Sequence, residues 1–116
     1  MITAENVRTG KRLAEKVEKA QSLKARCVGL LGRKDLASGE ALWLSPCAQV
    51  HTFFMAFPID VLFLDREGKA VRLCENMVPW RVSPWVWKAA GCLEMKAGSL
   101  AGQVAPGDIV KFIDHD

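Results

Sequence analysis

The longest patterned stretch of the chain runs from Val50 to Asp65 and reads VHTFFMAFPIDVLFLD. β-Branched and aromatic side chains dominate it, and polar residues interrupt it only briefly. This composition is typical of a central strand that is buried in a sheet. Strand alternation places His51 and Met55 on one face, and Asp60 follows closely behind a proline. The pattern therefore predicts a buried strand with a histidine and an acid embedded in it.

Shorter patterned segments surround this run, and turn signals separate them. Strands are predicted at Met1–Arg8, Ala41–Leu44, Lys69–Glu75, Gly91–Lys96 and Ile109–Ile113, with turns at Asp65–Gly68 and Pro106–Asp108. Many short strands joined by turns indicate a mainly β chain, folded as an antiparallel sandwich or a small barrel. No repeat, linker or low-complexity segment divides the chain, so residues 1–116 are expected to form a single domain.

One short helix is predicted at Ser22–Leu31. Ser22 is a favourable N-cap, apolar residues follow it at helical spacing, and Gly32 can end the helix. The preceding stretch, Lys11–Lys19, is ambiguous. Its alanine, glutamate and lysine content favours a helix, whereas a hairpin about Thr9–Gly10 would make it an edge strand.

Composition places the chain among ordinary folded proteins. Half of its 116 residues are hydrophobic, a quarter are charged, and the net charge is +3. The basic residues of the N-terminal third are interleaved with acids, which argues against a nucleic-acid surface. No apolar run reaches the length of a membrane span, and the N-terminus lacks an apolar signal segment. We therefore expect a cytoplasmic protein that binds neither nucleic acid nor membrane.

The four cysteines, Cys27, Cys47, Cys74 and Cys92, are widely spaced and lie among apolar residues. They form no C-x-x-C pair and no zinc-finger spacing with a histidine. The sequence predicts buried thiols in a reducing compartment, without disulfides.

His51 is the candidate general base, with Asp60 or Glu94 holding its tautomer. The competing interpretation is a structural histidine that is hydrogen-bonded within the sheet. That interpretation is favoured, because no nucleophile motif surrounds the histidine. Cys47 lies four residues before His51, but Pro46 interrupts the strand that would align them, so a Cys–His hydrolase is disfavoured.

A metal site would require His51, Asp60, Glu94 and Asp108 to converge on one cation. Neutralisation of these acids by Arg72 or Arg81 is the favoured interpretation, and no cofactor is predicted. His115, near the C-terminal end, is expected to belong to a frayed tail.

Three tryptophans, Trp80, Trp85 and Trp87, crowd a proline-containing loop predicted at Asn76–Lys88. Their rings could stack on a sugar, a base or the side chain of a partner. The alternative is that the loop folds over one end of the core and the indoles seal it. The sequence leaves both interpretations open.

Several of these segments resemble, in order, the family called Domain of Unknown Function 192. The resemblance is carried by Ser22–Arg33, His51–Asp65 with the following Gly68, Leu93–Gly98 and Pro106–Val110. It implies a compact, mainly β domain, often of jelly-roll type, with one short helix and no settled biochemical function. It also implies that Lys11–Lys19 is a strand. Family patterns often carry a tryptophan before the methionine that corresponds to Met55, where this chain has phenylalanines.

The sequence thus predicts a jelly-roll-like β-sandwich that acts as a non-catalytic ligand-binding module. Its ligand would be a sugar or another stacking molecule, or a protein partner would bind through the tryptophan loop. The predicted cleft and its rim consist of His51, Met55, Asp60, Glu94, Trp80, Trp85 and Trp87. The alternative is a small hydrolase or metal-dependent enzyme that uses the same residues.

Overall fold

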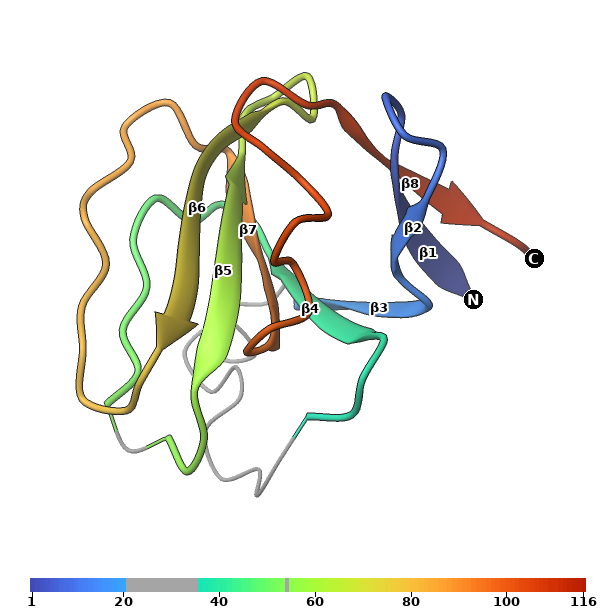
Figure 1. The fold of residues 1–116 in the computed structure, drawn as a ribbon. Coiled ribbons are helices and arrows are strands. Elements are labelled where there is room, and N and C mark those ends of the chain that lie inside the picture. Colours follow the sequence, from blue (N-terminus) through green and yellow to red (C-terminus); the bar gives the residue numbers. More distant parts are fainter. Residues whose placement is uncertain (21–35, 54) are drawn as a thin grey trace.

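The computed structural model describes residues 1–20, 36–53 and 55–116, and strands dominate these ranges (Figure 1). The strands are Ile2–Asn6 (β1), Arg12–Ala14 (β2), Lys16–Ala20 (β3), Glu40–Leu44 (β4), Ile59–Leu64 (β5), Ala70–Met77 (β6), Gly91–Lys96 (β7) and Val110–Asp114 (β8). The described ranges contain no helix. The helix predicted at Ser22–Leu31 lies outside the described residues.

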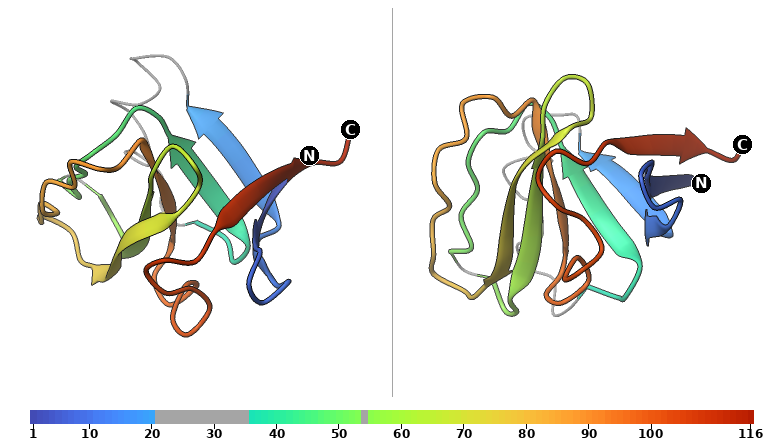
Figure 2. Two further views of the ribbon diagram at one scale, coloured as in Figure 1. Left: turned by 90° about the horizontal axis from the view of Figure 1, so that it is seen from above. Right: turned by 45° about the horizontal axis from the view of Figure 1, so that its top comes forward.

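The strands form two sheets, as the prediction of a mainly β sandwich requires. One has the order β2-β1-β8 and the other the order β3-β4-β7-β5-β6, and the two do not close into a barrel (Figure 2). The expectation of wholly antiparallel pairing is wrong at one place, because β3 pairs with β4 in parallel. A parallel pair needs a long crossover connection, and the segment between these two strands is long enough to supply it.

The ambiguous stretch Lys11–Lys19 consists of strands, as the family resemblance implied. Leu13, Ala14, Val17 and Ala20 are buried, and Val17 packs into the core between the sheets. Helix propensity amounts to a few tenths of a kcal/mol per residue, so burial and sheet pairing override it.

The prediction of a continuous buried strand from Val50 to Asp65 is wrong in its first half. Only Ile59–Leu64 forms a strand, and all of its residues are buried. Upstream of Pro58, His51 makes an isolated bridge to Val82, and Thr52 bonds to the backbone of residues 78–81. Proline lacks an N–H for ladder pairing, so the strand begins only after it.

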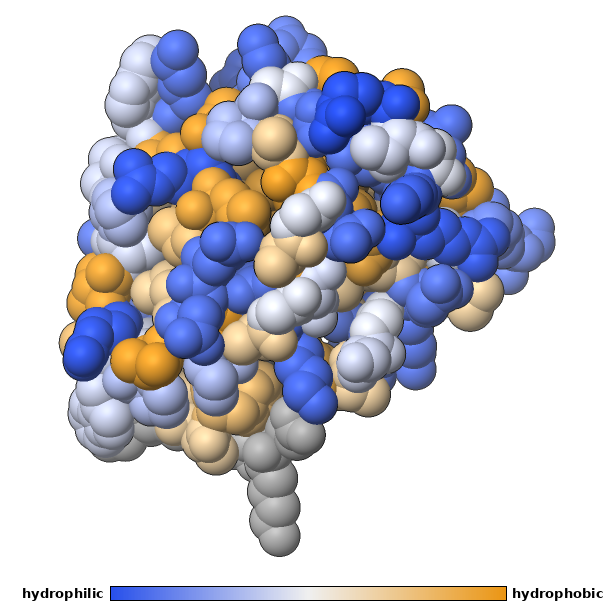
Figure 3. Space-filling model, in the orientation of Figure 1, coloured by the Kyte–Doolittle hydropathy of each residue, from blue (hydrophilic) through white to orange (hydrophobic). Residues whose placement is uncertain are grey.

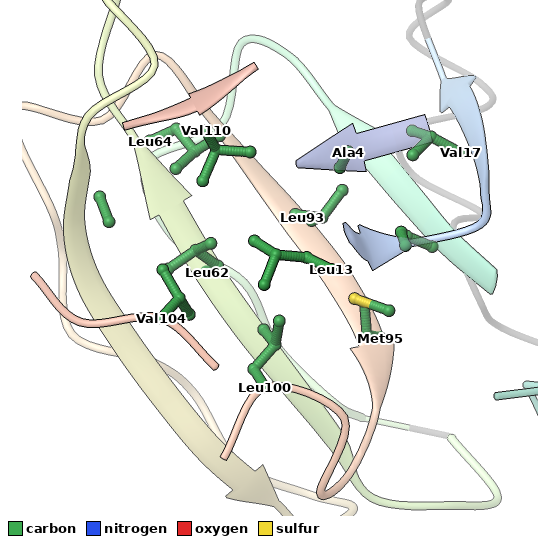
Figure 4. Close-up of a cluster of buried hydrophobic side chains, with 13 residues drawn as sticks. Ala4, Leu13, Val17, Leu62, Leu64, Leu93, Met95, Leu100, Val104 and Val110 are labelled. Carbon is green, nitrogen blue, oxygen red and sulfur yellow. The ribbon is translucent and has the colours of Figure 1, made fainter. Parts of the chain in front are cut away.

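The five-stranded sheet is apolar on both faces, and each face covers a separate core. Toward the three-stranded sheet lie Leu62, Leu93 and Met95, together with residues such as Leu13 and Leu100 (Figure 4). On the opposite face a second core gathers Leu42, Leu44, Val61, Phe63 and Cys92 beneath Val50, Met55 and Phe57. Burial on both faces explains why β5 is apolar at nearly every position.

The predicted turn at Asp65–Gly68 is confirmed. The Asp65 carboxylate accepts bonds from the amides of Glu67 and Lys69, each at 2.9 Å. Gly68 has a φ of 81°, and an added Cβ would lie 2.5 Å from the carbonyl oxygen of Val110. Glycine is required there for both its positive φ and the close approach of β8.

The C-terminal tail is held against β1, so the prediction that His115 is frayed is wrong. The His115 amide donates to the Met1 carbonyl at 2.9 Å, and its Nε2 lies 2.9 Å from Oγ1 of the buried Thr3. Both termini therefore lie together on one side of the molecule (Figure 1).

Candidate functional site

Two irregular segments, residues 47–53 and 78–90, run side by side over the outer face of the five-stranded sheet (Figure 1). Backbone bonds join them: Ser83 donates to Val50 at 2.9 Å, Thr52 to Arg81 at 2.8 Å and Val86 to Ala48 at 2.8 Å. These bonds position the tryptophan loop, which the sequence predicted without indicating its neighbour.

Thr52 is hydrogen-bonded to the turn that carries Trp80. Its buried hydroxyl donates to the Val78 carbonyl at 2.6 Å and accepts from the Arg81 amide at 2.9 Å. The Thr52 carbonyl accepts from the Trp80 amide at 3.0 Å, and Trp80 has a positive φ of 68°. Sequence reasoning missed Thr52, because threonine within an apolar run is also typical of an ordinary strand position.

His51 is exposed, which contradicts the prediction that its ring is drawn inward beside an acid. The imidazole lies on Phe53 at a centroid distance of 5.1 Å, and Phe53 lies on Trp80 at 5.8 Å. Nδ1 accepts from the Phe53 amide at 3.3 Å, which leaves the ring proton on Nε2. Strand alternation does not apply here, because this segment is not a strand.

Asp60 is fully buried and has a structural role. Its carboxylate accepts bonds from the amides of Asn76 at 2.8 Å, Gly98 at 3.0 Å and Leu100 at 3.0 Å. Asp60 thereby ties the end of β6 to the turn after β7. Three N–H donors satisfy the carboxylate there, so Asp60 does not hold the tautomer of His51.

Glu94 faces the opposite side of the sheet from Asp60. Glu94 pairs with Val61, which lies in the second core, whereas Asp60 pairs with Met95, which lies between the sheets. Residues directly opposite one another share a face, so the two carboxyl groups point apart. With His51 on the surface, the predicted cleft residues His51, Asp60 and Glu94 do not converge.

Glu94 is only 5% exposed. Removal from water, with a smaller contribution from the negative charge of Cys47, raises the pKa of Glu94 from 4.5 to about 8. Near neutral pH this carboxyl is therefore largely protonated within an apolar core. Met55 is buried in the same core.

Cys47 and Cys92 meet beside Glu94. The Cys92 thiol donates to the Cys47 sulfur at 3.1 Å, and that bond, together with burial, raises the Cys92 pKa above its usual value. None of the cysteines in the described ranges forms a disulfide; Cys92 is buried, as predicted, whereas Cys47 and Cys74 are only half-buried. Cys27 lies outside these ranges.

Asp108 forms part of a network that holds β1. It accepts from Arg8 Nε at 2.7 Å, from Asn6 Nδ2 at 3.0 Å and from the Ala105 amide at 2.9 Å. The Arg8 bond is the main reason that the pKa of Asp108 lies well below its usual range. The predicted partners Arg72 and Arg81 are wrong for this acid. Among the described residues, no group of three or more metal-ligating side chains comes together.

The tryptophans of the loop do not seal the core, because their side chains are mostly exposed. Trp80 is 56% exposed, Trp85 68% and Trp87 76%. A shallow groove of about 210 Å³ lies between the loop and β6, where Trp85 and Trp87 meet Arg72 and Lys88. Lys88 Nζ lies 5.2 Å from the ring centroid of Trp87. The molecular surface mixes such apolar and charged side chains (Figure 3).

The chain matches the family DUF192, described as "Uncharacterized ACR, COG1430", over residues 4–112. The chain belongs to this family. No functionally curated protein matches it. Among the described residues, no helix is long and apolar enough to cross a membrane.

Two solved structures share the fold. A protein of unknown function from Novosphingobium aromaticivorans has a TM-score of 0.80 and 23% identity, with 95% of this chain and 82% of that chain covered. A proposed transcription regulator from Sinorhizobium meliloti has a TM-score of 0.80 and 23% identity, with 96% of this chain and 91% of that chain covered. At this identity the likeness shows the fold alone.

Proposed function

We propose that this chain is a non-catalytic binding module whose ligand lies on the exposed tryptophans of the segment 78–88. The observation that carries the proposal is that three indoles of one loop, Trp80, Trp85 and Trp87, are each more than half exposed. Covering one such ring would contribute on the order of 3 kcal/mol before the costs of association. Thr52 holds the turn that carries Trp80, and the Val86 amide, between Trp85 and Trp87, donates to the Ala48 carbonyl.

The groove indicates the chemistry of the ligand. Indole faces at Trp85 and Trp87 favour a flat or saccharide ring, and the cationic side chains of Arg72 and Lys88 favour an anionic group on it. A groove of about 210 Å³ suits a single ring rather than a larger ligand. The ligand class is therefore a sugar or another stacking small molecule that carries a carboxylate or phosphate.

The alternative, a hydrolase or metal-dependent enzyme, is less favoured. The residues that such an enzyme would use do not lie together. His51 is exposed, the Asp60 carboxylate accepts bonds from backbone amides, and Glu94 faces the second core. A general base needs to reach the proton that it abstracts at a site shared with the other catalytic groups, and these three side chains do not share a site. For the location we propose the cytoplasm, where thiols stay reduced.

Intrinsic tryptophan fluorescence tests the proposal. The native chain is titrated with matched neutral and anionic ligands, such as glucose against glucuronate and benzyl alcohol against benzoate. We expect a saturable emission change that favours the anionic member of a pair. Trp87→Ala should weaken binding by roughly tenfold or more, the loss expected when one stacked ring is removed.

Trp43→Phe is the matched control. Trp43 is partly buried, lies 5.1 Å from Phe112 and is remote from the groove residues. Its replacement should leave affinity unchanged, while Lys88→Gln should weaken only the anionic ligands. Absence of a saturable change across the panel, equal effects of Trp87→Ala and Trp43→Phe, or consumption of any ligand would contradict the proposal.

A further inference from the structure

Two cysteines that are far apart in sequence are brought into contact at the start of β7. Cys92 belongs to β7, and Cys47 follows the end of β4. The Cys47 amide donates to the Ala90 carbonyl at 3.3 Å, and the Ser45 hydroxyl donates to the same oxygen at 3.1 Å. These bonds hold the segment 45–47 against β7, so the short distance between the sulfurs has local backbone support.

The sulfurs are 3.1 Å apart, whereas a disulfide requires about 2.05 Å. Closing the bond therefore requires an approach of about 1 Å between two side chains that already point at each other. No other cysteine pair in the described ranges has a sulfur–sulfur contact, although Cys74 also lies at the second core.

The two thiols differ in access. Cys92 is fully buried, whereas Cys47 is partly exposed and donates to the Gln49 carbonyl at 3.3 Å. A reagent in solution can therefore reach Cys47 but not Cys92. This asymmetry gives one attacking thiol and one resolving thiol, which is the arrangement that thiol–disulfide exchange requires.

We propose that Cys47 and Cys92 form a redox-active pair that closes to an intramolecular disulfide by exchange with a low-molecular-weight disulfide. The Cys47 thiolate attacks one sulfur of the reagent disulfide, whose S–S bond breaks and releases one thiol. Cys92 then gives up its proton and attacks the Cys47 sulfur, which releases the second thiol. The protein dithiol loses two electrons and two protons, and the reagent disulfide becomes two thiols.

Glu94 is the buried acid nearest this chemistry along β7. It lies two residues after Cys92, so alternation places both side chains on one face of the strand. Glu94 pairs with Val61 and Cys92 pairs with Phe63, and both partners belong to the second core, against which Cys47 also packs. In its ionised form Glu94 can accept the proton that Cys92 releases inside the core, where water is scarce. Glu94 is thus the proton acceptor for the resolving step. This proposal is independent of the tryptophan surface.

Peptide mapping tests the pairing in the unmodified chain. Cleavage after lysine and arginine places Cys27, Cys47, Cys74 and Cys92 on four separate peptides, 27–33, 35–66, 73–81 and 89–96. The folded protein is treated with oxidised glutathione, its remaining thiols are blocked, and the digest is analysed by mass spectrometry. We expect the linked pair 35–66 and 89–96 to dominate, and to disappear in a digest prepared after reduction.

Linkage of Cys47 to another cysteine, or stable glutathione adducts on Cys47 without linkage, would overturn the proposal. The oxidised protein should also melt at a higher temperature than the reduced protein, because the bond closes a loop across 45 positions of the chain. A lower melting temperature would show that the fold does not accommodate the bond.

Stopped-flow kinetics tests the order of steps and the role of Glu94. In a Cys27→Ser/Cys74→Ser background, dithiobis(nitrobenzoate) should release its coloured thiolate in two phases, first at Cys47 and then on closure. Adding Cys92→Ser should abolish the second phase and leave a stable adduct, and adding Cys47→Ser should abolish both. Glu94→Gln should slow the second phase by roughly tenfold or more and leave the first unchanged. If that variant slowed both phases equally, or neither, Glu94 would have no part in the resolving step.

Discussion

Raising the pH from about 5 to about 9 should weaken the folded state through Glu94. The folded protein holds this carboxyl with a pKa of about 8, whereas an unfolded chain returns it to about 4.5. Between these values the folded state binds more protons than the unfolded state. The stabilising contribution is therefore fully present below pH 4.5 and is lost progressively as the pH rises to about 8.

The magnitude follows from the interval between the two pKa values. Each pKa unit corresponds to about 1.4 kcal/mol, so the full interval amounts to roughly 5 kcal/mol. From pH 5 upward, roughly 4 kcal/mol remains to be lost. That loss is large beside the total of roughly 5–15 kcal/mol that stabilises a typical domain. The physical source is the removal of an ionised carboxylate from water into the apolar surroundings of the second core.

Urea unfolding at a series of pH values, followed by circular dichroism in a reducing buffer, measures the effect. Glu94→Gln keeps the shape of the side chain without a titratable proton, so its stability should vary less with pH. The variant should match the native protein at pH 5 within about 1 kcal/mol and exceed it by roughly 4 kcal/mol at pH 9. Glu75→Gln, on the exposed part of β6, is the matched control and should follow the native protein throughout.

The difference in stability between the native chain and Glu94→Gln cancels the titration of groups that do not interact with Glu94. Asp108 would in any case contribute at the acid end, because its lowered pKa gives stability that is lost only as the pH falls. Equal pH slopes for the native chain and Glu94→Gln, or a native chain that is more stable than the variant at pH 9, would refute the reasoning.

Three further substitutions test the structural bonds by urea unfolding. Asp60→Ala should cost roughly 3 kcal/mol or more, because the buried Leu100 amide and the partly buried amides of Asn76 and Gly98 lose their acceptor; a cost below about 1 kcal/mol would contradict this role. Thr52→Val should cost roughly 1–3 kcal/mol and speed hydrogen exchange at Arg81, whereas Thr52→Ser should retain most of the stability. Gly91→Ala should cost roughly 1–3 kcal/mol, because the new Cβ would meet Trp43 at 2.5 Å; an unchanged midpoint would show that Trp43 moves freely.

Much of the fold could be predicted where local chemistry decides it. Gly91–Lys96 was predicted with the bounds that β7 has, because its apolar residues and flanking glycines define it. The turn at Asp65–Gly68 follows from an acid that caps the turn and a glycine at positive φ. The break near Pro58 was visible in the sequence, but the apolar run before it has the composition of a strand and instead forms an irregular cover over the second core.

The candidate site was predictable in its members but not in its arrangement. The apolar pattern alone could not predict whether the tryptophan side chains are buried or exposed, because an apolar residue in a loop fits either outcome. Alternation predicted an inward His51, and the prediction was wrong because alternation requires a strand.

The sequence by itself determined that the chain is mainly β and where most strands and turns lie. These features depend on residues that are close in the chain. Only the tertiary structure decided that Asp108 binds Arg8, that Cys47 meets Cys92, and that Asp60 and Glu94 face different cores. Those contacts depend on which strands pair and in which register, and a one-residue change of register would reverse every face. The register of the strands depends on which side chains are buried when all the strands pack together, so no single segment of the sequence determines it.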